Sequence, residues 1–486
     1  MKKIIFRFNL MLFVLLAFSA NTFSQSNGDI MWKRNFGGNY TDEFRSVTAV
    51  SDGIIVVGSS SSFNTGDWAG IAGGGSTDAI ILKYNNNGNI LWRKNLIKNR
   101  GSFFNSVTAV SDGIIAVGMS NSSTIAIIVK YDNNGNLIWQ RDFEGYYATV
   151  TTALDGIIAV GSATSFGNND WEDVVGKGLN DAIIVKYDNA GNVLWKKNFG
   201  GSSSDRFHSV TAVSDGVIAV GYSMQASFGN GDWEGITAKG FGSDAIIVKY
   251  NNNGDIVWKR NFGGNHVDTF NSVTAVSDGI IAVGNSFADS FGYGDWAGIA
   301  RKGGQDATII KYNHNGDMVW RKSFGGSGDD FYNSVTAVGN RIIAVGRSVV
   351  FNNGDWVGIA RKGMIDAIIV EYDNNGDVVW RENFGGNNND YYISVATVGD
   401  NIIAVGCSSF GSFGNGDWVG VWEKGEIDGI IVKYTIRTTD IILPSMVNQP
   451  KIVGLYSITG VQLQKQPEKG VYIIMYDDGV RKKVIK

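Results

Sequence analysis

Six Asp-Trp pairs recur along the chain and bring together two side-chain types that are well suited to binding a sugar. An indole offers a flat apolar face for stacking, and the neighbouring carboxylate accepts hydrogen bonds from hydroxyl groups. A ring of such pairs would form a set of ligand platforms on one surface. The pairs are Asp67-Trp68, Asp170-Trp171, Asp232-Trp233, Asp295-Trp296, Asp355-Trp356 and Asp417-Trp418.

The same pairs have a purely structural interpretation. Each tryptophan would plug its own loop onto the protein core, and each aspartate would cap backbone amides of the loop. The sequence around the pair changes little from one copy to the next, as in Ser62-Phe63-Asn64-Thr65-Gly66-Asp67-Trp68. Because repeated spacing is typical of a structural element, it favours packing for any single loop.

Two further sets of aspartates recur, but their spacing does not predict a metal site. Calcium needs several oxygen ligands that converge on one point, and no Asp-x-Asp-x-Asp cluster supplies them. We expect these carboxylates to cap turns and to pair with Lys177, Lys239, Lys302, Lys362 or Lys424. The two sets are Asp42, Asp205, Asp268, Asp330 and Asp390, and Asp78, Asp181, Asp244, Asp306, Asp366 and Asp428.

Catalytic signatures are weak in this sequence. Only three histidines occur, His208, His266 and His314. Their positions are unrelated, so we expect solvated loop residues. No nucleophile motif or phosphate-binding glycine loop is found. The sequence therefore predicts a protein without a cofactor or metal that is not an enzyme.

The elements that position these residues are repeats. The segment Ser46-Val47-Thr48-Ala49-Val50 recurs with small changes at 106, 149, 209, 272, 334 and 394, which gives spacings of 60, 43, 60, 63, 62 and 60. Each unit contains four segments that are rich in β-branched residues and lack helical periodicity. In the first unit they are 46–50, 53–58, 78–84 and 89–94. Regular repetition of this kind indicates one repeat array rather than several domains.

The turns and the chain ends indicate a closed ring. Asn-Gly turns such as Asn87-Gly88 join strands three and four, and Ser51-Asp52-Gly53 joins strands one and two. The chain begins with an isolated tryptophan strand around Trp32, and the last unit, 428–434, lacks that strand. We predict an all-β fold, a seven-bladed β-propeller with four-stranded blades in which the N-terminal strand closes the last blade. A β-solenoid and an unclosed stack are the alternatives.

Loop lengths and repeat defects predict where a ligand binds. The long connections, from strand two to three and from blade to blade, lie on one face. The second unit lacks the Asp-Trp loop, and the segments 96–101 and 143–147 lack the Phe-Gly-Gly pattern seen elsewhere. We expect a notch here that anchors a partner, although decay of one repeat is an equal alternative. Its predicted lining is Arg100, Phe103, Glu144, Tyr146 and Tyr147.

The N-terminal segment and the composition indicate an exported protein. Residues 1–24 contain Lys2, Lys3 and Arg7 followed by the apolar run 10–20, which is typical of a signal peptide cut after Ser24. The net charge is −4, and it becomes −7 without the three basic residues of this segment, which excludes a basic nucleic-acid surface. No transmembrane segment is predicted. The single cysteine, Cys407, excludes intramolecular disulfides, and we interpret its thiol as inert.

The last residues resemble a known sorting module. All three prolines, Pro444, Pro450 and Pro467, follow the repeats. The segments 455–460, 469–474 and 481–486 resemble the C-terminal sorting domain of the bacterial type IX secretion system, without its usual Tyr-Pro-Asn-Pro-like opening. This resemblance implies passage through the outer membrane by that machinery. The predicted organisation is a signal peptide (1–24), a propeller (28–434), a linker (435–450) and a sorting-like β module (451–486).

The repeats themselves are similar to those of secreted bacterial propellers. The similarity includes the quinoprotein type around 188–191 and Trp195, but it brings no cofactor residues. We predict a secreted or cell-surface monomer that recognises a glycan or a protein through its long-loop face. A carbohydrate-active hydrolase or lyase that uses loop carboxylates, and a structural surface protein, are the alternatives.

Overall fold

The structure is a computed structural model that describes residues 28–98, 101–120, 125–435, 452–457, 462–463, 471–476 and 481–485. The chain forms two compact units, residues 1–435 and 436–486. The predicted signal peptide and residues 436–450 of the predicted linker lie outside the described residues.

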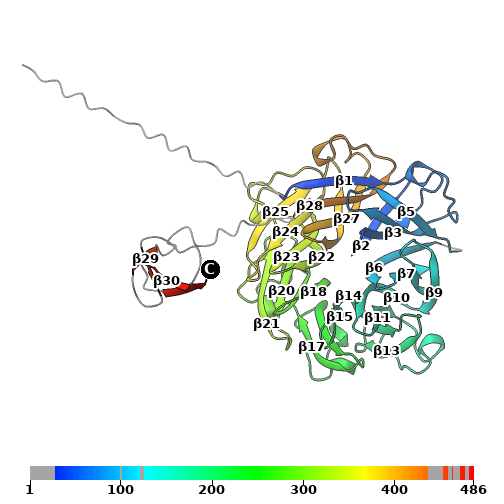
Figure 1. Cartoon of the computed structure of the whole chain (residues 1–486). Helices are drawn as coiled ribbons and strands as arrows, with labels where there is room; N and C mark the ends of the chain where they lie inside the picture. The colour runs from blue at the N-terminus through cyan, green and yellow to red at the C-terminus, as the bar shows by residue number, and fades with distance from the viewer. Residues whose placement is uncertain are drawn as a thin grey trace, which may run out of the picture. The chain divides into compact units, whose positions relative to one another are not determined.

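The first unit is built from seven four-stranded antiparallel sheets arranged around an axis (Figure 1). Each sheet is one blade. Its strands run outward from the axis in chain order, except that the outer strand of blade 7 is β1. Blade 1 is β2 (Asp42–Val50), β3 (Gly53–Ser60), β4 (Asp78–Asn85) and β5 (Ile90–Leu96); blade 2 is β6 (Ser102–Val110), β7 (Gly113–Ser120), β8 (Ile125–Tyr131) and β9 (Leu137–Glu144); blade 3 is β10 (Tyr146–Ala153), β11 (Gly156–Ala163), β12 (Asp181–Tyr187) and β13 (Val193–Phe199).

The remaining blades follow the same plan. Blade 4 is β14 (Asp205–Val213), β15 (Gly216–Met224), β16 (Ser243–Asn251) and β17 (Ile256–Phe262); blade 5 is β18 (Asp268–Val276), β19 (Gly279–Phe287), β20 (Gln305–Tyr312) and β21 (Met318–Phe324); blade 6 is β22 (Asp330–Val338), β23 (Arg341–Ser348), β24 (Asp366–Tyr372) and β25 (Val378–Phe384); blade 7 is β26 (Asp390–Val398), β27 (Asn401–Ser409), β28 (Ile427–Thr435) and β1 (Ile30–Phe36).

The ring is closed by the first strand of the chain. Strand β1 pairs antiparallel with β28, with Trp32 opposite Lys433 and Phe36 opposite Gly429. The inner strand of each blade contacts the inner strands of both neighbours, and β26 contacts β2. The prediction of a seven-bladed propeller closed by its N-terminal strand is therefore confirmed.

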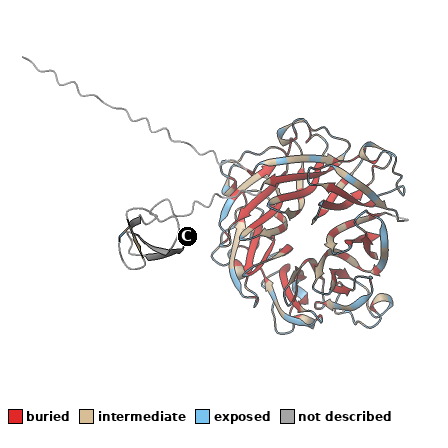
Figure 2. Ribbon diagram, viewed as in Figure 1, coloured by how far each residue is buried: buried red, intermediate tan, exposed pale blue. Residues whose placement is uncertain are grey.

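The hydrophobic core lies between the blades. The two middle strands of a blade carry consecutive apolar residues, as in Ile54 to Val57, and every residue of β3 is buried. Exposed residues gather at the outer strands (Figure 2). A strand with two apolar faces is stable only when both are covered, and here the neighbouring blades cover them.

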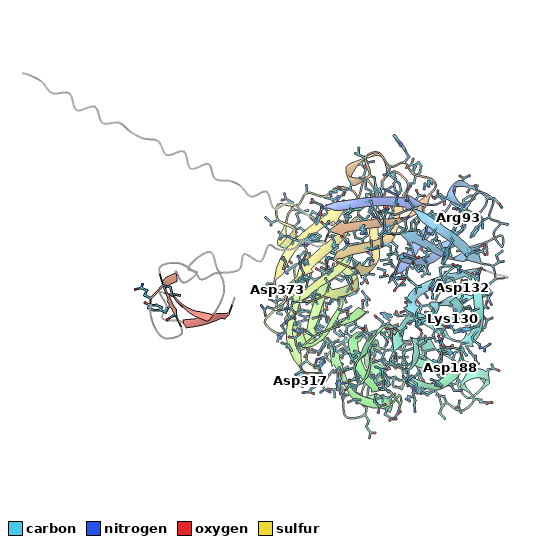
Figure 3. The ribbon with its side chains drawn as sticks, viewed as in Figure 1. Arg93, Lys130, Asp132, Asp188, Asp317 and Asp373 are labelled. Atoms are coloured by element: carbon cyan, nitrogen blue, oxygen red, sulfur yellow. The ribbon has the colours of Figure 1, made fainter. Side chains whose placement is uncertain are left out.

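On the face with the short turns, the outer-strand tryptophans of all blades except blade 6 donate Nε1 to a backbone carbonyl of the next blade. Trp139 Nε1 donates to the carbonyl of Asn189 at 3.1 Å, in the β12–β13 turn that also contains Asp188 (Figure 3). A Cβ on Gly191 would lie 3.1 Å from this indole, so the close contact requires glycine. Lys130 is buried beside it and pairs with Asp112 at 2.8 Å. The outer-strand tryptophans thus hold the ring together.

The second unit is a small three-stranded antiparallel sheet. It contains β29 (Ile452–Ser457), β30 (Val471–Tyr476) and β31 (Arg481–Ile485), with β30 in the middle. Across all described residues, no helix is both long and apolar enough to cross a membrane.

Candidate functional site

The long loops all emerge at one face, where short 3-10 turns position the Asp-Trp pairs. Six of these turns contain the pairs: η1 (Gly66–Trp68), η2 (Asn169–Trp171), η4 (Gly231–Trp233), η6 (Gly294–Trp296), η7 (Gly354–Trp356) and η8 (Gly416–Trp418). Two more, η3 (Gln225–Ser227) and η5 (Ala288–Ser290), occur only in blades 4 and 5 among the described loops.

The six loop tryptophans are fully buried, which corrects the interpretation of them as ligand platforms. All six indoles are 0% exposed. Trp68, for example, packs edge-on against Phe36 at 5.0 Å and against Phe63 at 4.9 Å, and its Nε1 donates to Asp42 at 2.9 Å. Neither indole face is available for stacking. The structural interpretation, in which each tryptophan plugs its loop, describes the geometry.

The aspartates of the pairs are likewise engaged by the protein. Asp232 Oδ2 accepts from Gly200 N at 2.9 Å and pairs with Lys177 of the preceding blade at 2.6 Å. Asp67, Asp295, Asp355 and Asp417 repeat both contacts, with Lys424, Lys239, Lys302 and Lys362. These lysines were expected to pair with the aspartates before strand three, such as Asp181. Instead, Asp181 accepts the backbone N–H of Lys177, while the ammonium bridges to the next blade.

The other recurring aspartates are buried. Burial raises the pKa of Asp244 to about 7, and that of Asp330 and Asp428 to about 6. Asp268 accepts from Trp296 Nε1 at 2.9 Å and from Gly264 N at 2.8 Å, so its carboxyl group anchors the loop plug. Among the described residues, no group of three or more His, Cys, Asp or Glu could hold a metal ion.

His208 is not a solvated loop residue as expected, because it lies in the inner strand β14. Its Nδ1 is 3.1 Å from the carbonyl of Phe270 in the next blade. Asn271 makes the equivalent contact to the carbonyl of Tyr332. Burial lowers the pKa of His208 to about 4, so the ring is neutral at physiological pH. His208 therefore substitutes for asparagine in a link between blades. His266 and His314 do lie outside the strands.

The connection into blade 3 is irregular on the long-loop face. Five residues separate β17 from β18, but only Gly145 separates β9 from β10. The register of β10 on β11 places Tyr146 at the position that Glu43 occupies in blade 1. Gly145 therefore stands where blade 1 has Asp42, and four residues of the connection before it are missing. Trp171 is nevertheless buried, and its Nε1 donates to the carbonyl of Glu144 at 2.8 Å.

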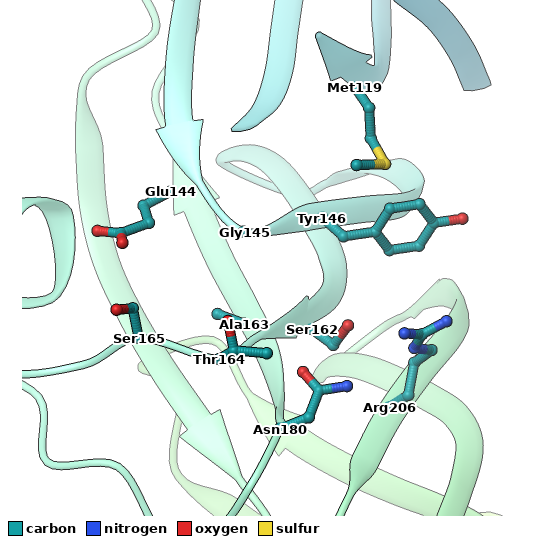
Figure 4. Close-up of a pocket in the computed structure, with 10 residues that line it drawn as sticks. All are labelled: Met119, Glu144, Gly145, Tyr146, Ser162, Ala163, Thr164, Ser165, Asn180 and Arg206. Atoms are coloured by element: carbon teal, nitrogen blue, oxygen red, sulfur yellow. The ribbon is translucent and has the colours of Figure 1, made fainter. Parts of the chain in front are cut away.

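The missing residues leave a pocket of about 490 Å³. It extends from Tyr146 and Arg206 on the inner strands β10 and β14, and Met119 near the end of β7, to Glu144 at the end of the outer strand β9 (Figure 4). We call it the blade-3 pocket. Its volume falls within the range of small-ligand sites. Its other lining residues are Gly145, Ser162, Ala163, Thr164, Ser165 and Asn180.

The blade-3 pocket has opposite charges at its two ends. Figure 4 shows the Glu144 carboxylate at one side and the Arg206 guanidinium at the other. Arg206 lies 5.4 Å from the ring centroid of Tyr146, and its buried Nε has no hydrogen-bond partner among the described residues. The side-chain amide of Asn180 and the hydroxyl of Thr164 lie between them and make no hydrogen bond within the described part of the protein. These polar groups are available to a bound molecule.

The structure brings together only part of the predicted notch. Glu144 and Tyr146 line the pocket, whereas Tyr147 is a core residue whose hydroxyl bonds to that of Tyr187. Phe103 lies at the inner strand of blade 2, with the Arg45 guanidinium 4.5 Å from its ring centroid. Arg100 lies outside the described residues.

Sequence reasoning missed Arg206, Met119 and Asn180, which belong to blades 4, 2 and 3. The short spacing between the second and third repeats contained a usable signal. Strand two ends at Ser60 and strand three begins at Asp78 in blade 1, whereas the corresponding bounds in blade 2 are Ser120 and Ile125. This shorter loop accounts for most of the lost length. The remainder is the missing connection into blade 3.

Cys407 and its surroundings fit the interpretation of an inert thiol. The residue is 7% exposed, and burial raises the pKa of its thiol to about 12.

Comparison with known proteins finds similarity in part of the repeat array. Residues 77–226, roughly a third of the chain, match the family profile described as outer membrane protein assembly factor BamB. This segment is similar to that family. A curated relative, the regulatory protein FlaEY of Caulobacter vibrioides, is 26% identical over 180 residues, which cover 34% of this chain and 18% of that protein. The match thus spans under a fifth of FlaEY.

Two solved structures are among those similar to this chain. BamB from Moraxella catarrhalis is 12% identical with a TM-score of 0.38, and the match covers 83% of this chain and 97% of that one. The WD40 propeller domain of Doa1 is 12% identical with a TM-score of 0.43, covering 82% and 95%. Such similarity concerns the fold alone.

Proposed function

We propose that the protein is a non-enzymatic binding propeller that holds an extended segment of a partner protein in the blade-3 pocket. The observation that carries this proposal is the opening left by the four missing residues. Within the described residues, the buried Arg206 Nε in its lining has no hydrogen-bond partner, and the Glu144 carboxylate accepts only one hydrogen bond, from Asn169 at 3.3 Å. A carboxylate at one end and a guanidinium at the other suit a peptide, which carries both charges and backbone amide groups.

The regular long-loop residues support a binding role over an enzymatic one. The loop carboxylates that an enzyme would use, such as Asp232 and Asp295, cap backbone amides and pair with lysines. The buried indoles offer no platform for a sugar in these loops. The BamB-like repeats agree with a role in contacting other proteins, because that family is described as an assembly factor.

The proposal includes export to the cell surface or medium as a monomer. Its supports are the signal-like pattern of residues 1–24 and the resemblance of the tail to a type IX sorting domain. Fractionation of the source cells, with mass spectrometry of both termini of the mature protein, tests it. A chain that is retained inside the cell with residues 1–24 still attached would refute export.

A loop graft tests the pocket with little disturbance. Blades 3 and 7 share the flanks Phe143 with Phe384 and Tyr146-Tyr147 with Tyr391-Tyr392. Replacing Glu144-Gly145 by Gly-Gly-Asn-Asn-Asn-Asp, the sequence of 385–390, restores the missing connection and fills the pocket. The grafted aspartate would also supply the anchor that Trp171 lacks.

The assay is selection from a phage-displayed peptide library on the immobilised protein. We expect the natural protein to enrich a peptide family, and the grafted variant to lose it with an unchanged melting temperature. Arg206→Gln and Glu144→Gln should each weaken binding of the enriched peptide by about tenfold, because each removes a charge-assisted hydrogen bond. The proposal is wrong if no peptide is enriched, or if the graft binds the same peptides equally well.

A further inference from the structure

Blades 4 and 5 have a long loop from strand two to strand three. The spans Gly221 to Trp233 and Gly284 to Trp296, like Gly406 to Trp418 in blade 7, are each two residues longer than Gly161 to Trp171 in blade 3. In blades 4 and 5 these loops contain the turns η3 and η5. The two blades are adjacent in the ring, so their loops are neighbours on the long-loop face.

Two hollows lie side by side between the long loops of blades 4 and 5. One has a volume of about 480 Å³ and the other about 540 Å³. Phe241 and Asn265 line both, so the hollows are continuous. We call them together the rim groove. It runs from Gln225 in blade 4 to Tyr293 and Arg301 in blade 5.

The rim groove exposes two large aromatic side chains. Phe241 is 66% exposed and Tyr293 is 59% exposed, whereas the loop tryptophans beneath them, Trp233 and Trp296, are fully buried. Covering an aromatic ring is favourable, and a ring held at the edge of a groove offers its surface to a ligand. The stacking surfaces that the sequence suggested for the Asp-Trp pairs are thus supplied by their neighbours.

The groove is polar but electrically balanced. Lys239 pairs with Asp295 at 3.3 Å, and Arg301 lies 3.9 Å from Asp289. His266 also lines the groove, and the side-chain amides of Gln225 and Asn265 form no hydrogen bond to another described residue. A charged ligand finds no uncompensated opposite charge here, while hydroxyl groups find free amides.

We propose that the rim groove binds a neutral oligosaccharide. The apolar face of a sugar ring would stack on Phe241 or Tyr293, and its hydroxyl groups would bond to the amides of Asn265 and Gln225. The length of the groove across two blades accommodates more than one sugar unit. The protein then has two separate ligand sites, a blade-3 pocket for a peptide and a rim groove for a glycan.

Calorimetric titration of the whole protein with cellohexaose, mannohexaose, xylohexaose and chitohexaose tests this. We expect at least one to bind with a dissociation constant in the millimolar range or tighter. Phe241→Ala and Tyr293→Ala should each weaken binding about tenfold, because each removes one stacking surface. Phe410→Ala, which alters a ring that is 63% exposed on blade 7, is the matched control and should change nothing.

The outcomes separate the two proposals. The blade-3 graft should keep sugar binding while it loses the peptide. The glycan proposal is refuted if none of the four hexaoses binds, or if Phe410→Ala weakens binding as much as Phe241→Ala. It is also refuted if oligogalacturonate, the charged counterpart, binds better than every neutral sugar, because the groove then selects charge.

Discussion

Blades 3 and 5 contain the same tryptophan plug but differ in what surrounds it. In blade 5, Trp296 Nε1 donates to Asp268, and the residues 263–267 cover the loop. In blade 3, Trp171 is equally buried, yet its Nε1 donates to the backbone carbonyl of Glu144 and the covering residues are absent. A decaying repeat would be expected to lose its buried plug together with its surface loop. The preserved plug indicates that the pocket is an opening in an intact blade.

The ion pairs between blades show the same difference. Five aspartates of the Asp-Trp pairs bind a lysine from the preceding blade. Asp170 in blade 3 forms no such pair within the described residues, because blade 2 lacks the loop that would supply the lysine. Blade 1 has Gly74 where other blades have this lysine. The gap in the ring of ion pairs therefore coincides with the sector that opens.

The largest expected effect tests whether the two plugs are equivalent. Both Trp296 and Trp171 are fully buried. Trp296→Ala and Trp171→Ala should each lower the free energy of unfolding by about 3–5 kcal/mol, because each removes a buried indole. Urea unfolding followed by far-UV circular dichroism measures this.

The control for the plugs is the loop tryptophan outside the Asp-Trp pairs. Trp422 is 77% exposed. We expect Trp422→Ala to change the free energy of unfolding by at most about 0.5 kcal/mol, as for most surface substitutions. If Trp171→Ala lowered the free energy of unfolding much less than Trp296→Ala, blade 3 would be loosely packed, and the two tryptophans would not be equivalent.

The buried carboxyl groups at the regular junctions should make stability depend on pH. The pKa of Asp244 is raised by burial from 3.8 to about 7, so the folded protein binds this proton more tightly than the unfolded chain. Between these two values the folded state holds more protons, and the free energy of unfolding falls as pH rises. The contribution is complete below pH 3.8 and is lost above pH 7.

We therefore expect the unfolding free energy to be lower at pH 8 than at pH 5, by on the order of 1 kcal/mol for each such group. Asp244→Asn should reduce this difference, because it removes the buried titrating group. Midpoints of urea unfolding measured at several pH values test this pH dependence. A stability that rises steadily from pH 5 to pH 8 would contradict the assignment.

The smallest effect concerns the ion pairs between blades. The Lys302 and Asp355 side chains are 29% and 33% exposed. Because solvent screens such a pair, Lys302→Met should cost at most about 1 kcal/mol, and the loss should shrink further in high salt. Melting temperatures measured in low and high salt check this. If Lys302→Met unfolded the propeller, such ion pairs would be essential for stability. The lack of a lysine partner for Asp170 would then mean that blade 3 is strongly destabilised.

The architecture was predictable because the sequence repeats the same pattern of strands and turns in every blade. Strand alternation, the Asn-Gly turns and the unpaired strand around Trp32 each report on local backbone geometry, and seven copies reinforce one another. The confirmed fold follows from these features alone. The burial of the Asp-Trp tryptophans could be anticipated in part, since identical spacing favoured packing.

The candidate sites were less accessible from sequence because they depend on what lies across a blade boundary. Tyr146 was found since it sits in the irregular segment, but Arg206 is an ordinary first-strand residue of blade 4 and becomes a pocket residue only through the register of its neighbour. Phe241 and Tyr293 carry no motif. Their importance comes from exposure, which is a property of the folded loops rather than of the residues.

The pairing of β1 with β28 has a consequence for the time course of folding. Its backbone contacts join Thr435 to Asp29, residues separated by 406 positions, so the last blade is incomplete until nearly the whole ring has been synthesised. Contacts of such long range form slowly because a large loop must close first. Until then β28 presents an unpaired edge that can recruit another chain. The protein is therefore most prone to aggregation after β28 has been synthesised and before it pairs with β1.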